Sequence, residues 1–243
     1  VLYFFDIPVF ASPYLSLPLS DERRSGLLAP TFELNTNSGV GVGIPYYFNI
    51  APNRDFTLLP RLMSKRGVQL GGEFRYLEPN YSGNVQMEYL PNDLILHHDR
   101  WFYRLRHQQN LPSVLPGLSF YADVARVSDA TYPSDLGQNV GTVVQQQFNQ
   151  EVGVKHDIGN WHTFARVQKF QTLEPNVPPF NRVPQLNLQY NDDTSLTDFI
   201  FKVEADATGF EMPGTRSSVM PNGQRAFIKP ELSYLYRTPG YFI

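Results

Sequence analysis

The chain has 243 residues, of which 42% are hydrophobic, 14% aromatic and 18% charged, and its formal net charge at pH 7 is −3. That charge is spread through the sequence without a basic patch, which argues against nucleic acid as a partner, and the absence of cysteine excludes disulfides, thiol nucleophiles and zinc-thiolate sites. No uncharged apolar run of about 18 residues occurs, which excludes a transmembrane helix but not a transmembrane barrel, because barrel strands alternate apolar and polar residues.

The first residues, VLYFFDIPVFASPYLSLPL, favour extended structure from the start and lack the charged n-region and apolar h-region of a signal peptide. The last residues, RTPGYFI, stop just after a turn signal. We therefore expect both ends to be cut, so that the chain is either a processed protein or a piece of a longer one.

From residue 27 onward, alternation of apolar and polar residues is the dominant pattern. It predicts about a dozen strands, most of them near the roughly 9–11 residues with which a tilted strand crosses a bilayer. The predicted strands cover roughly 27–35, 40–49, 55–63, 67–77, 84–91, 100–109, 117–127, 145–155, 160–171, 182–191, 197–208 and 225–236.

The alternation separates an apolar face from a charged face. In 199–208 the odd positions are phenylalanine, valine and alanine, while the even ones include Lys202, Glu204 and Asp206. In a soluble sandwich the polar face meets the solvent outside, whereas in a large pore the apolar face meets lipid and the charged face meets a watery lumen. The alternation by itself leaves both architectures open.

The predicted connections fall into two classes. Short turns (APNR, EPNYSG, HDIG and NDDTS) follow the second, fourth, eighth and tenth strands, and longer loops follow the seventh, ninth and eleventh. Turns on one side and loops on the other are typical of outer-membrane barrels. Aromatic residues near many predicted strand ends, such as Tyr76, Tyr89 and Trp101, fit the interfacial girdles of such barrels.

Several motifs occur in a fixed order between residues 7 and 132. They are IPVFASPYLSLPL, SGLLAP, PYYFNIAPNRD, RLMSKRG, EFRYL, EYLPND and VSDATY. In these motifs and their order the chain resembles the LptD family, the LPS-assembly proteins of Gram-negative outer membranes. Beyond residue 132 the resemblance rests on general β-barrel character.

The resemblance implies an all-β fold, namely an antiparallel transmembrane β-barrel segment of about a dozen strands, preceded by the end of a periplasmic β-jellyroll domain. Residues 1–20 would be the end of the jellyroll and the junction, and residues 21–243 the N-terminal part of the outer-membrane barrel. An isolated half-barrel would expose two unpaired edges to lipid, so we expect another segment to close it.

The function implied by the resemblance is translocation of lipopolysaccharide and its insertion into the outer leaflet of the outer membrane. The implied partners are lipopolysaccharide itself, the lipoprotein LptE as a plug inside the barrel, the periplasmic LptA bridge through the N-terminal domain, and outer-membrane lipids. No cofactor, metal or catalytic residue is implied.

The resemblance also implies a lateral seam, weakened by prolines in the first strands, and Pro30 and Pro45 match those positions. Proline lacks a backbone N–H and therefore removes a ladder hydrogen bond. Gly39, Gly41 and Gly43 would loosen the second strand further, since they have no side chains to pack. The alternative is that both prolines only begin or bend strands, as is expected of Pro60, Pro91 and Pro230.

The charged face is the second candidate site. The alternation predicts that seven charged side chains point into the lumen, where they would pair with one another, contact the plug or meet sugar and phosphate groups of the cargo. They are Glu73, Arg75, Arg104, Arg106, Lys202, Glu204 and Asp206. Ion pairing between neighbouring strands is the ordinary explanation of such charges.

A catalytic role finds little support in the sequence. His97, His98 and Asp99 form the only tight cluster of catalytic residue types, and no serine in a recognisable strand-turn context accompanies them. On a strand the two histidines would point to opposite faces, which does not suit a metal site, so an exposed loop is predicted there. The alternatives to a transport barrel are an outer-membrane barrel enzyme of the lipase or protease type and a soluble β-sandwich binding protein.

Overall fold

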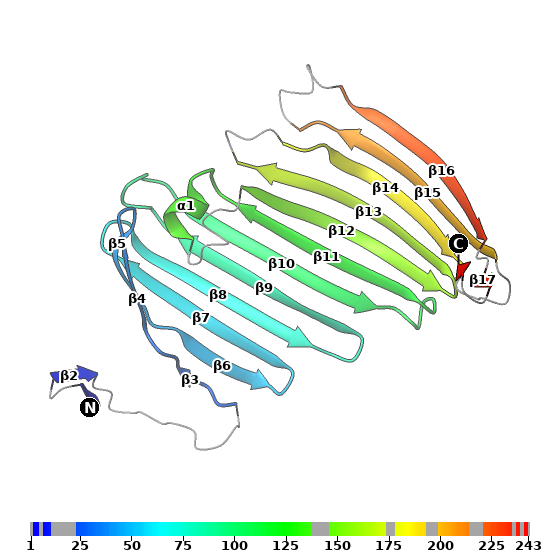
Figure 1. Cartoon of the computed structure of the whole chain (residues 1–243). Helices are drawn as coiled ribbons and strands as arrows, with labels where there is room; N and C mark the ends of the chain where they lie inside the picture. The colour runs from blue at the N-terminus through cyan, green and yellow to red at the C-terminus, as the bar shows by residue number, and fades with distance from the viewer. Residues whose placement is uncertain are drawn as a thin grey trace.

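Alternating apolar and polar residues form long antiparallel strands along most of the chain (Figure 1). The computed structural model describes residues 2–4, 7–10, 23–137, 146–173, 178–192, 199–213, 221–234, 237–238 and 241–242. One antiparallel sheet of 14 strands contains β3 to β16. No helix in this described part is long and apolar enough to span a membrane.

Two small sheets flank the large one in sequence. One pairs β1 (Leu2–Phe4) with β2 (Ile7–Phe10), and the other pairs β17 (Arg237–Thr238) with β18 (Tyr241–Phe242). Most of the predicted jellyroll end at residues 1–20 lies outside the described residues, so that domain assignment stays a prediction.

The large sheet begins with four short strands, β3 (Gly26–Leu27), β4 (Thr31–Asn35), β5 (Gly39–Gly43) and β6 (Tyr46–Ala51). Ten longer strands follow, each paired with its neighbours in sequence. They are β7 (Arg54–Met63), β8 (Gly67–Leu77), β9 (Tyr81–Leu90), β10 (Arg100–Asn110), β11 (Leu118–Val127), β12 (Gln147–Ile158), β13 (Trp161–Thr172), β14 (Asn181–Asn191), β15 (Phe199–Glu211) and β16 (Gly223–Tyr234).

The ten longer strands confirm the segments predicted from residue 55 onward, with ends that differ by a few residues. The first two predicted strands are wrong as continuous elements. Segment 27–35 is divided into β3 and β4 around Pro30, and segment 40–49 into β5 and β6 before and after Pro45. The prediction extended the alternation through both prolines, although each removes a ladder donor. The 14 observed strands therefore correspond to the predicted dozen.

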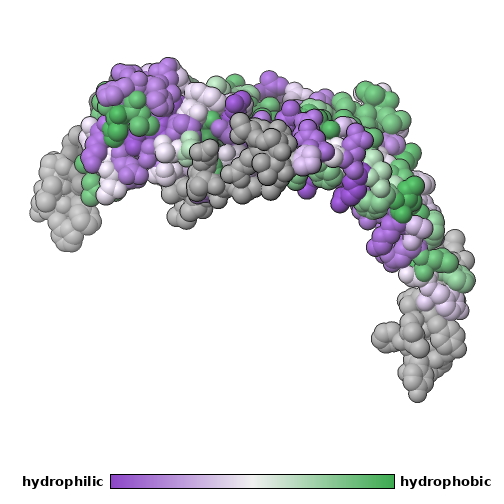
Figure 2. All heavy atoms as spheres, turned by 90° about the horizontal axis from the view of Figure 1, so that it is seen from above, coloured by the Kyte–Doolittle hydropathy of each residue, from purple (hydrophilic) through white to green (hydrophobic). Residues whose placement is uncertain are grey.

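One face of the sheet is apolar and exposed. It carries rows of large hydrophobic side chains, and Phe199 and Phe201 remain 51% and 40% exposed. Within the described residues no second sheet pairs with this one or continues it beyond β4, β3 and β16. Figure 2 shows the sheet as an arc, with hydrophobic residues along the outer side of its right-hand part. The apolar rows thus do not form the core of a two-layer sandwich in this part of the chain.

The opposite face, called here the polar face, carries side chains that are polar and buried. Buried polar residues on the long strands include Asp55, Arg61, Gln69, Gln185 and Asp206. They are buried by one another across neighbouring strands, as the hydrogen bonds between Gln69 and Arg61 and between Gln185 and Asp206 illustrate. Buried polar groups require hydrogen-bond partners, and here they provide them for one another.

Aromatic side chains gather near both ends of the strands. At one end, Tyr76 contacts Tyr81, and Phe199 contacts Tyr234, with ring centroids 6.0 and 4.7 Å apart. At the other end of the sheet, the rings of Trp101 and Tyr103 stack with centroids 5.6 Å apart. Two aromatic bands of this kind flank the apolar band of transmembrane barrels.

A short helix, α1 (Tyr132–Leu136), lies in the connection between β11 and β12 and packs on the polar face. Its residues Tyr132 and Leu136 are fully buried and join a hydrophobic cluster with Met63, Leu90 and Phe148. The sequence predicted a long loop here, not a helix. Five residues with a proline at the second position are too short for helical periodicity to be visible.

Candidate functional site

Pro30 and Pro45 lie where the hydrogen-bond ladder between β3–β4 and β5–β6 is interrupted. The paired residues that border the interruption are Leu27 with Tyr46 and Thr31 with Gly43. Residues 28–30 therefore face only residues 44–45, which makes a bulge that contains both prolines. Neither proline has an N–H to offer, so the bulge cannot form a full set of ladder bonds.

A third proline, Pro60 of β7, lies beside the same bulge. The Leu28 N–H donates to the Pro45 carbonyl over 2.9 Å, and the Ile44 N–H donates to the Pro60 carbonyl over 3.2 Å. In an antiparallel ladder the N–H and C=O of one residue point to the same neighbour, so Pro45 and Pro60 each accept one bond and donate none. A cavity of about 210 Å³ lies at this place. From the sequence, Pro60 was expected only to begin or bend a strand.

The three glycines of β5 are close to side chains from neighbouring strands. Gly39 has φ +79°, a conformation that favours glycine. A Cβ on Gly41 would collide with the Glu33 side chain, and one on Gly43 would lie 2.5 Å from the Thr31 hydroxyl oxygen. The glycines therefore leave room that Glu33 and Thr31 of β4 occupy.

Glu33 crosses β5 above Gly41 and reaches Arg61 of β7. The Arg61 Nη2 lies 2.5 and 2.6 Å from the two carboxylate oxygens. Arg61 is buried and also donates to the Leu136 carbonyl over 3.0 Å and to the Gln69 side-chain oxygen over 3.2 Å. Arg61 of β7 therefore joins β4, β8 and α1.

Tyr132 anchors α1 to the sheet through its hydroxyl. It donates to the Glu88 carboxylate over 2.6 Å and accepts from the Gln69 amide over 2.9 Å. Burial, followed by the nearby Glu88 carboxylate, raises the pKa of the Tyr132 phenol far above its ordinary value. The phenol therefore stays protonated and remains a hydrogen-bond donor at physiological pH.

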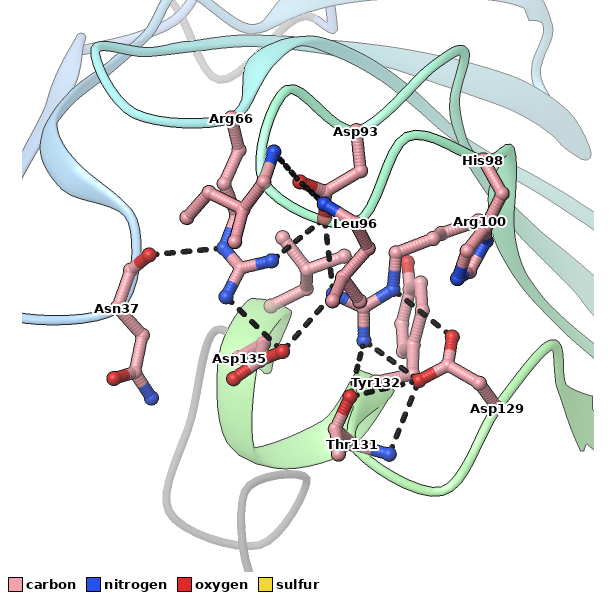
Figure 3. A network of polar contacts seen from close by, with 12 residues as sticks. Asn37, Arg66, Asp93, Leu96, His98, Arg100, Asp129, Thr131, Tyr132 and Asp135 are labelled. Atoms are coloured by element: carbon pink, nitrogen blue, oxygen red, sulfur yellow. Dashed lines mark hydrogen bonds and ion pairs between the residues drawn. The ribbon is translucent and has the colours of Figure 1, made fainter.

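Two arginines and three aspartates form a charge network beside α1 (Figure 3). Arg66 lies 2.6 Å from Asp93 and 3.0 Å from Asp135. Arg100, which is fully buried, lies 3.1 Å from Asp93, 3.0 Å from Asp135 and 2.8 Å from Asp129. Buried charges of this kind are tolerated only when they are paired and hydrogen-bonded.

The network lowers the pKa of two of its carboxyls. Burial alone would raise the pKa of Asp129, but hydrogen bonds from Arg100 and Ser128 outweigh burial and lower the pKa to about 2. For Asp93, burial is likewise outweighed by the Ile95 backbone N–H and by Arg100 and Arg66, so its pKa lies below the ordinary value. Both groups are therefore ionised at neutral pH and hold the arginines in place.

The network also holds the turn between β4 and β5. The Arg66 Nε donates to the Asn37 carbonyl over 2.9 Å, and the Asn37 side-chain amide donates to the Ser134 carbonyl over 3.4 Å. Asn37 lies in the turn between β4 and β5, so this end of the hairpin is bound to α1.

Comparison with known proteins places the chain in a family. A family model described as LPS transport system D, LptD, matches residues 98–243. The chain is 49% identical to the LPS-assembly protein LptD of Ralstonia nicotianae over all of its length and 30% of that protein's length. Identity is 46% to the protein of the same name from Cupriavidus pinatubonensis and 46% to that from Paraburkholderia xenovorans, again over the whole chain and 30% of each relative. The chain belongs to the LptD family.

The motifs that carried the resemblance to the LptD family meet in space. Arg66 belongs to RLMSKRG, Asp93 to EYLPND, and Asp129 and Tyr132 to VSDATY. No role was predicted from the sequence for Arg66, Arg100 or Asp129. The available signal was that charged and aromatic residues recurred inside recognisable motifs at the same end of successive strands.

The strand register places all seven charged residues that were predicted to face the lumen on the polar face. Arg75 forms two hydrogen bonds with Asp55, of 2.7 and 3.0 Å, and Glu73 accepts from Asn84 and Gln86. Asp206 accepts from Gln185 and Thr208. Cross-strand partners thus account for these three charges.

The other four predicted charges differ in how they are paired. Lys202 and Glu204 stand opposite Glu231 and Lys229 on β16, each facing the opposite charge. Arg104 and Arg106 both lie 3.8 Å from the same carboxylate, Asp123. That these side chains face a lumen in LptD family members stays a prediction.

The predicted exposed loop around His97, His98 and Asp99 is confirmed. All three residues lie in the exposed connection between β9 and β10, where Asp99 accepts a 2.6 Å hydrogen bond from Tyr89. The buried member of that connection is Asp93, which belongs to the charge network.

Proposed function

We propose that this chain is part of the wall of an outer-membrane barrel that moves lipopolysaccharide to the outer leaflet. The proposal is carried by the two faces of the sheet, one with exposed hydrophobic rows and one with mutually paired polar side chains. Lipid against the first face and water against the second would satisfy both. The relatives are LPS-assembly proteins, and the chain spans 30% of their length, so the complete activity also needs the other parts of the protein.

The alternatives fit these observations less well. A soluble sandwich has to bury its apolar rows, yet Leu186 and Ile228 are 51% and 74% exposed. The family is described as a transport system, which does not suggest a barrel lipase or protease. The two aromatic bands are also more typical of a membrane protein.

Insertion of the cargo into the membrane is proposed to occur at the bulge between β3–β4 and β5–β6. Pro30, Pro45 and Pro60 converge on one bulge, and each lacks a ladder donor. A hydrogen bond contributes about 0.5–1.5 kcal/mol of net stability, so several missing bonds lower the cost of local strand separation. Lipopolysaccharide would leave sideways through this seam once the strand that completes the barrel is in place.

Two protein partners follow from this assignment. The polar face would receive LptE as a plug, because it offers hydrogen-bonding groups and faces away from lipid. The segment before residue 21 would lead to the periplasmic domain that receives cargo from LptA. The protein would accordingly reside in the outer membrane.

The seam is tested by replacing Pro30 and Pro45 with alanine in the full-length protein. Export of lipopolysaccharide to the cell surface should fall at normal protein levels, because the new N–H groups can complete the ladder. Pro230→Ala on β16, away from the bulge, is the matched control and should export normally. Unimpaired export by the double variant would remove the seam from the proposal.

A further inference from the structure

A cavity of about 300 Å³ opens on the polar face across β9 to β12. By strand register, Ser82, Arg106, Gln108, Tyr121 and Lys155 share this face and line the cavity. All five lie within a few residues of the strand ends next to the connections at 78–80, 111–117 and 159–160. Short connections mark the periplasmic end of outer-membrane barrels, so the cavity lies near the entrance that the proposed function requires.

The positive charge around this cavity is incompletely neutralised. Arg104 and Arg106 share one carboxylate, Asp123, at 3.8 Å each, which is beyond hydrogen-bond distance. The Arg104 Nε and one Asp123 carboxylate oxygen are buried without a hydrogen-bond partner. Lys155 forms no ion pair in the described part of the chain, and its ammonium lies 4.8 Å from the centre of the Tyr121 ring. Three cations thus surround a single acid.

Other arginines on the same face are paired with carboxylates at hydrogen-bond distance. Arg75 holds Asp55 with two short hydrogen bonds, and Arg166 lies 3.1 Å from Glu151. Glu151 of β12 stands directly opposite Asp123 of β11. It already accepts from Arg166 and from the Tyr121 hydroxyl, over 3.1 and 2.7 Å, and does not serve the cavity. The shortfall of acid is local to β10–β12.

We propose that this cavity binds a phosphate group of a phosphorylated saccharide as it enters the barrel. The proposal rests on the proposed function and names the chemical group of the cargo that this part of the face would contact. Arginine offers paired N–H donors that match phosphate oxygens, and lysine adds a point charge. Ser82 and Gln108 supply neutral hydrogen-bonding groups for adjacent sugar hydroxyls.

The experiment uses the full-length protein extracted in detergent together with its bound partner proteins, with the photo-crosslinking residue benzoylphenylalanine at position 108. Intact lipopolysaccharide and enzymatically dephosphorylated lipopolysaccharide serve as probes. The variants are R106Q/K155Q and the milder K155Q, and R126Q is the matched control because Arg126 is exposed and stands opposite Tyr103, on the apolar face. Correct folding of each variant is checked by heat-modifiable mobility on gels.

With intact lipopolysaccharide, R106Q/K155Q should reduce the crosslinking yield about tenfold and K155Q by a smaller factor, since hydrogen bonds to charged groups are the strong ones. R126Q should match the unmodified protein. With the dephosphorylated probe, all variants should crosslink equally and weakly. Equal crosslinking of intact lipopolysaccharide by R106Q/K155Q and R126Q overturns the phosphate site. If only K155Q folds, equal crosslinking by K155Q and R126Q overturns it.

Three further outcomes separate this site from the proposed function. If position 108 captures an acidic segment of a partner protein instead of lipopolysaccharide, the cations serve protein contact and the phosphate site is wrong. If position 189, further along the polar face, crosslinks to lipopolysaccharide while position 108 does not, only the phosphate site fails. If neither position crosslinks in the unmodified protein, the proposed function itself fails.

Discussion

Buried charge is concentrated in a few residues at one end of the sheet. Arg100 has no exposed surface and is held by Asp93, Asp129 and Asp135. Removing one member of such a group leaves the others partly unpaired, which costs more than the whole group contributes relative to apolar residues. The network therefore mainly fixes the geometry of the connections. Its net contribution to the free energy of unfolding is smaller than the cost of removing one of its members.

Asp129 makes this network sensitive to acid. Its pKa of about 2 in the folded chain lies below the value of about 3.9 in an unfolded chain. The stabilisation is therefore complete above about pH 5 and is lost as the pH falls toward 2, to the extent of about 2 kcal/mol. Unfolding of the full-length protein should show this loss between pH 5 and about 2, and Asp129→Asn should flatten it. An unchanged pH profile in the variant would assign the acid sensitivity to other groups.

Gly41 is a second position where one residue decides local structure. Gly41→Ala places a Cβ against Glu33 and should displace it from Arg61, at a cost of about 1–3 kcal/mol. Gly26→Ala is the matched control, because a Cβ at Gly26 meets nothing within 4 Å. Thermal unfolding monitored by gel mobility should distinguish the two variants. Equal midpoints would mean that Glu33 adjusts without leaving Arg61.

Among the elements, the long strands could be predicted, whereas the breaks near the start of the sheet and the helix between β11 and β12 could not. Alternation over ten or more residues, as in β15 and its pairing to β14, is a strong signal since one face is apolar throughout. The division at Pro30 and Pro45 was missed as a break in the strands, although the prolines were recognised. Helix α1 was missed because its burial depends on Glu88, Gln69 and Arg61, which are far away in sequence.

The anchoring of α1 is tested through one hydroxyl. Tyr132→Phe removes the shorter of two hydrogen bonds to the half-buried Glu88 carboxylate, the other coming from the Gln69 amide, and should cost about 1–3 kcal/mol. Tyr89→Phe removes a hydroxyl that bonds to exposed Asp99 and should have almost no effect. Limited proteolysis of the connection between β11 and β12 is the measurement, with faster cleavage expected only for Tyr132→Phe. Equal cleavage rates in the two variants would show that packing alone holds the helix.

At the scale of the whole molecule, the sheet has two unlike surfaces. The candidate lumen residues were predictable from alternation because cross-strand register keeps each face consistent over many strands. Their individual pairing was not predictable, since it depends on which strand lies next to which. Asp55 beside Arg75 and Asp123 between two arginines are examples.

The division of the sheet into a lipid face and a water face is the central claim. The most direct test places single cysteines at Leu186, Asn187, Leu188 and Gln189 of β14 in the full-length protein, otherwise free of reactive cysteines, in outer membranes. A water-soluble maleimide should label positions 187 and 189, whereas a fluorophore at 186 or 188 should be quenched by lipid-borne nitroxides. Labelling of 186 and 188 from water, with 187 and 189 in contact with lipid, would contradict the account.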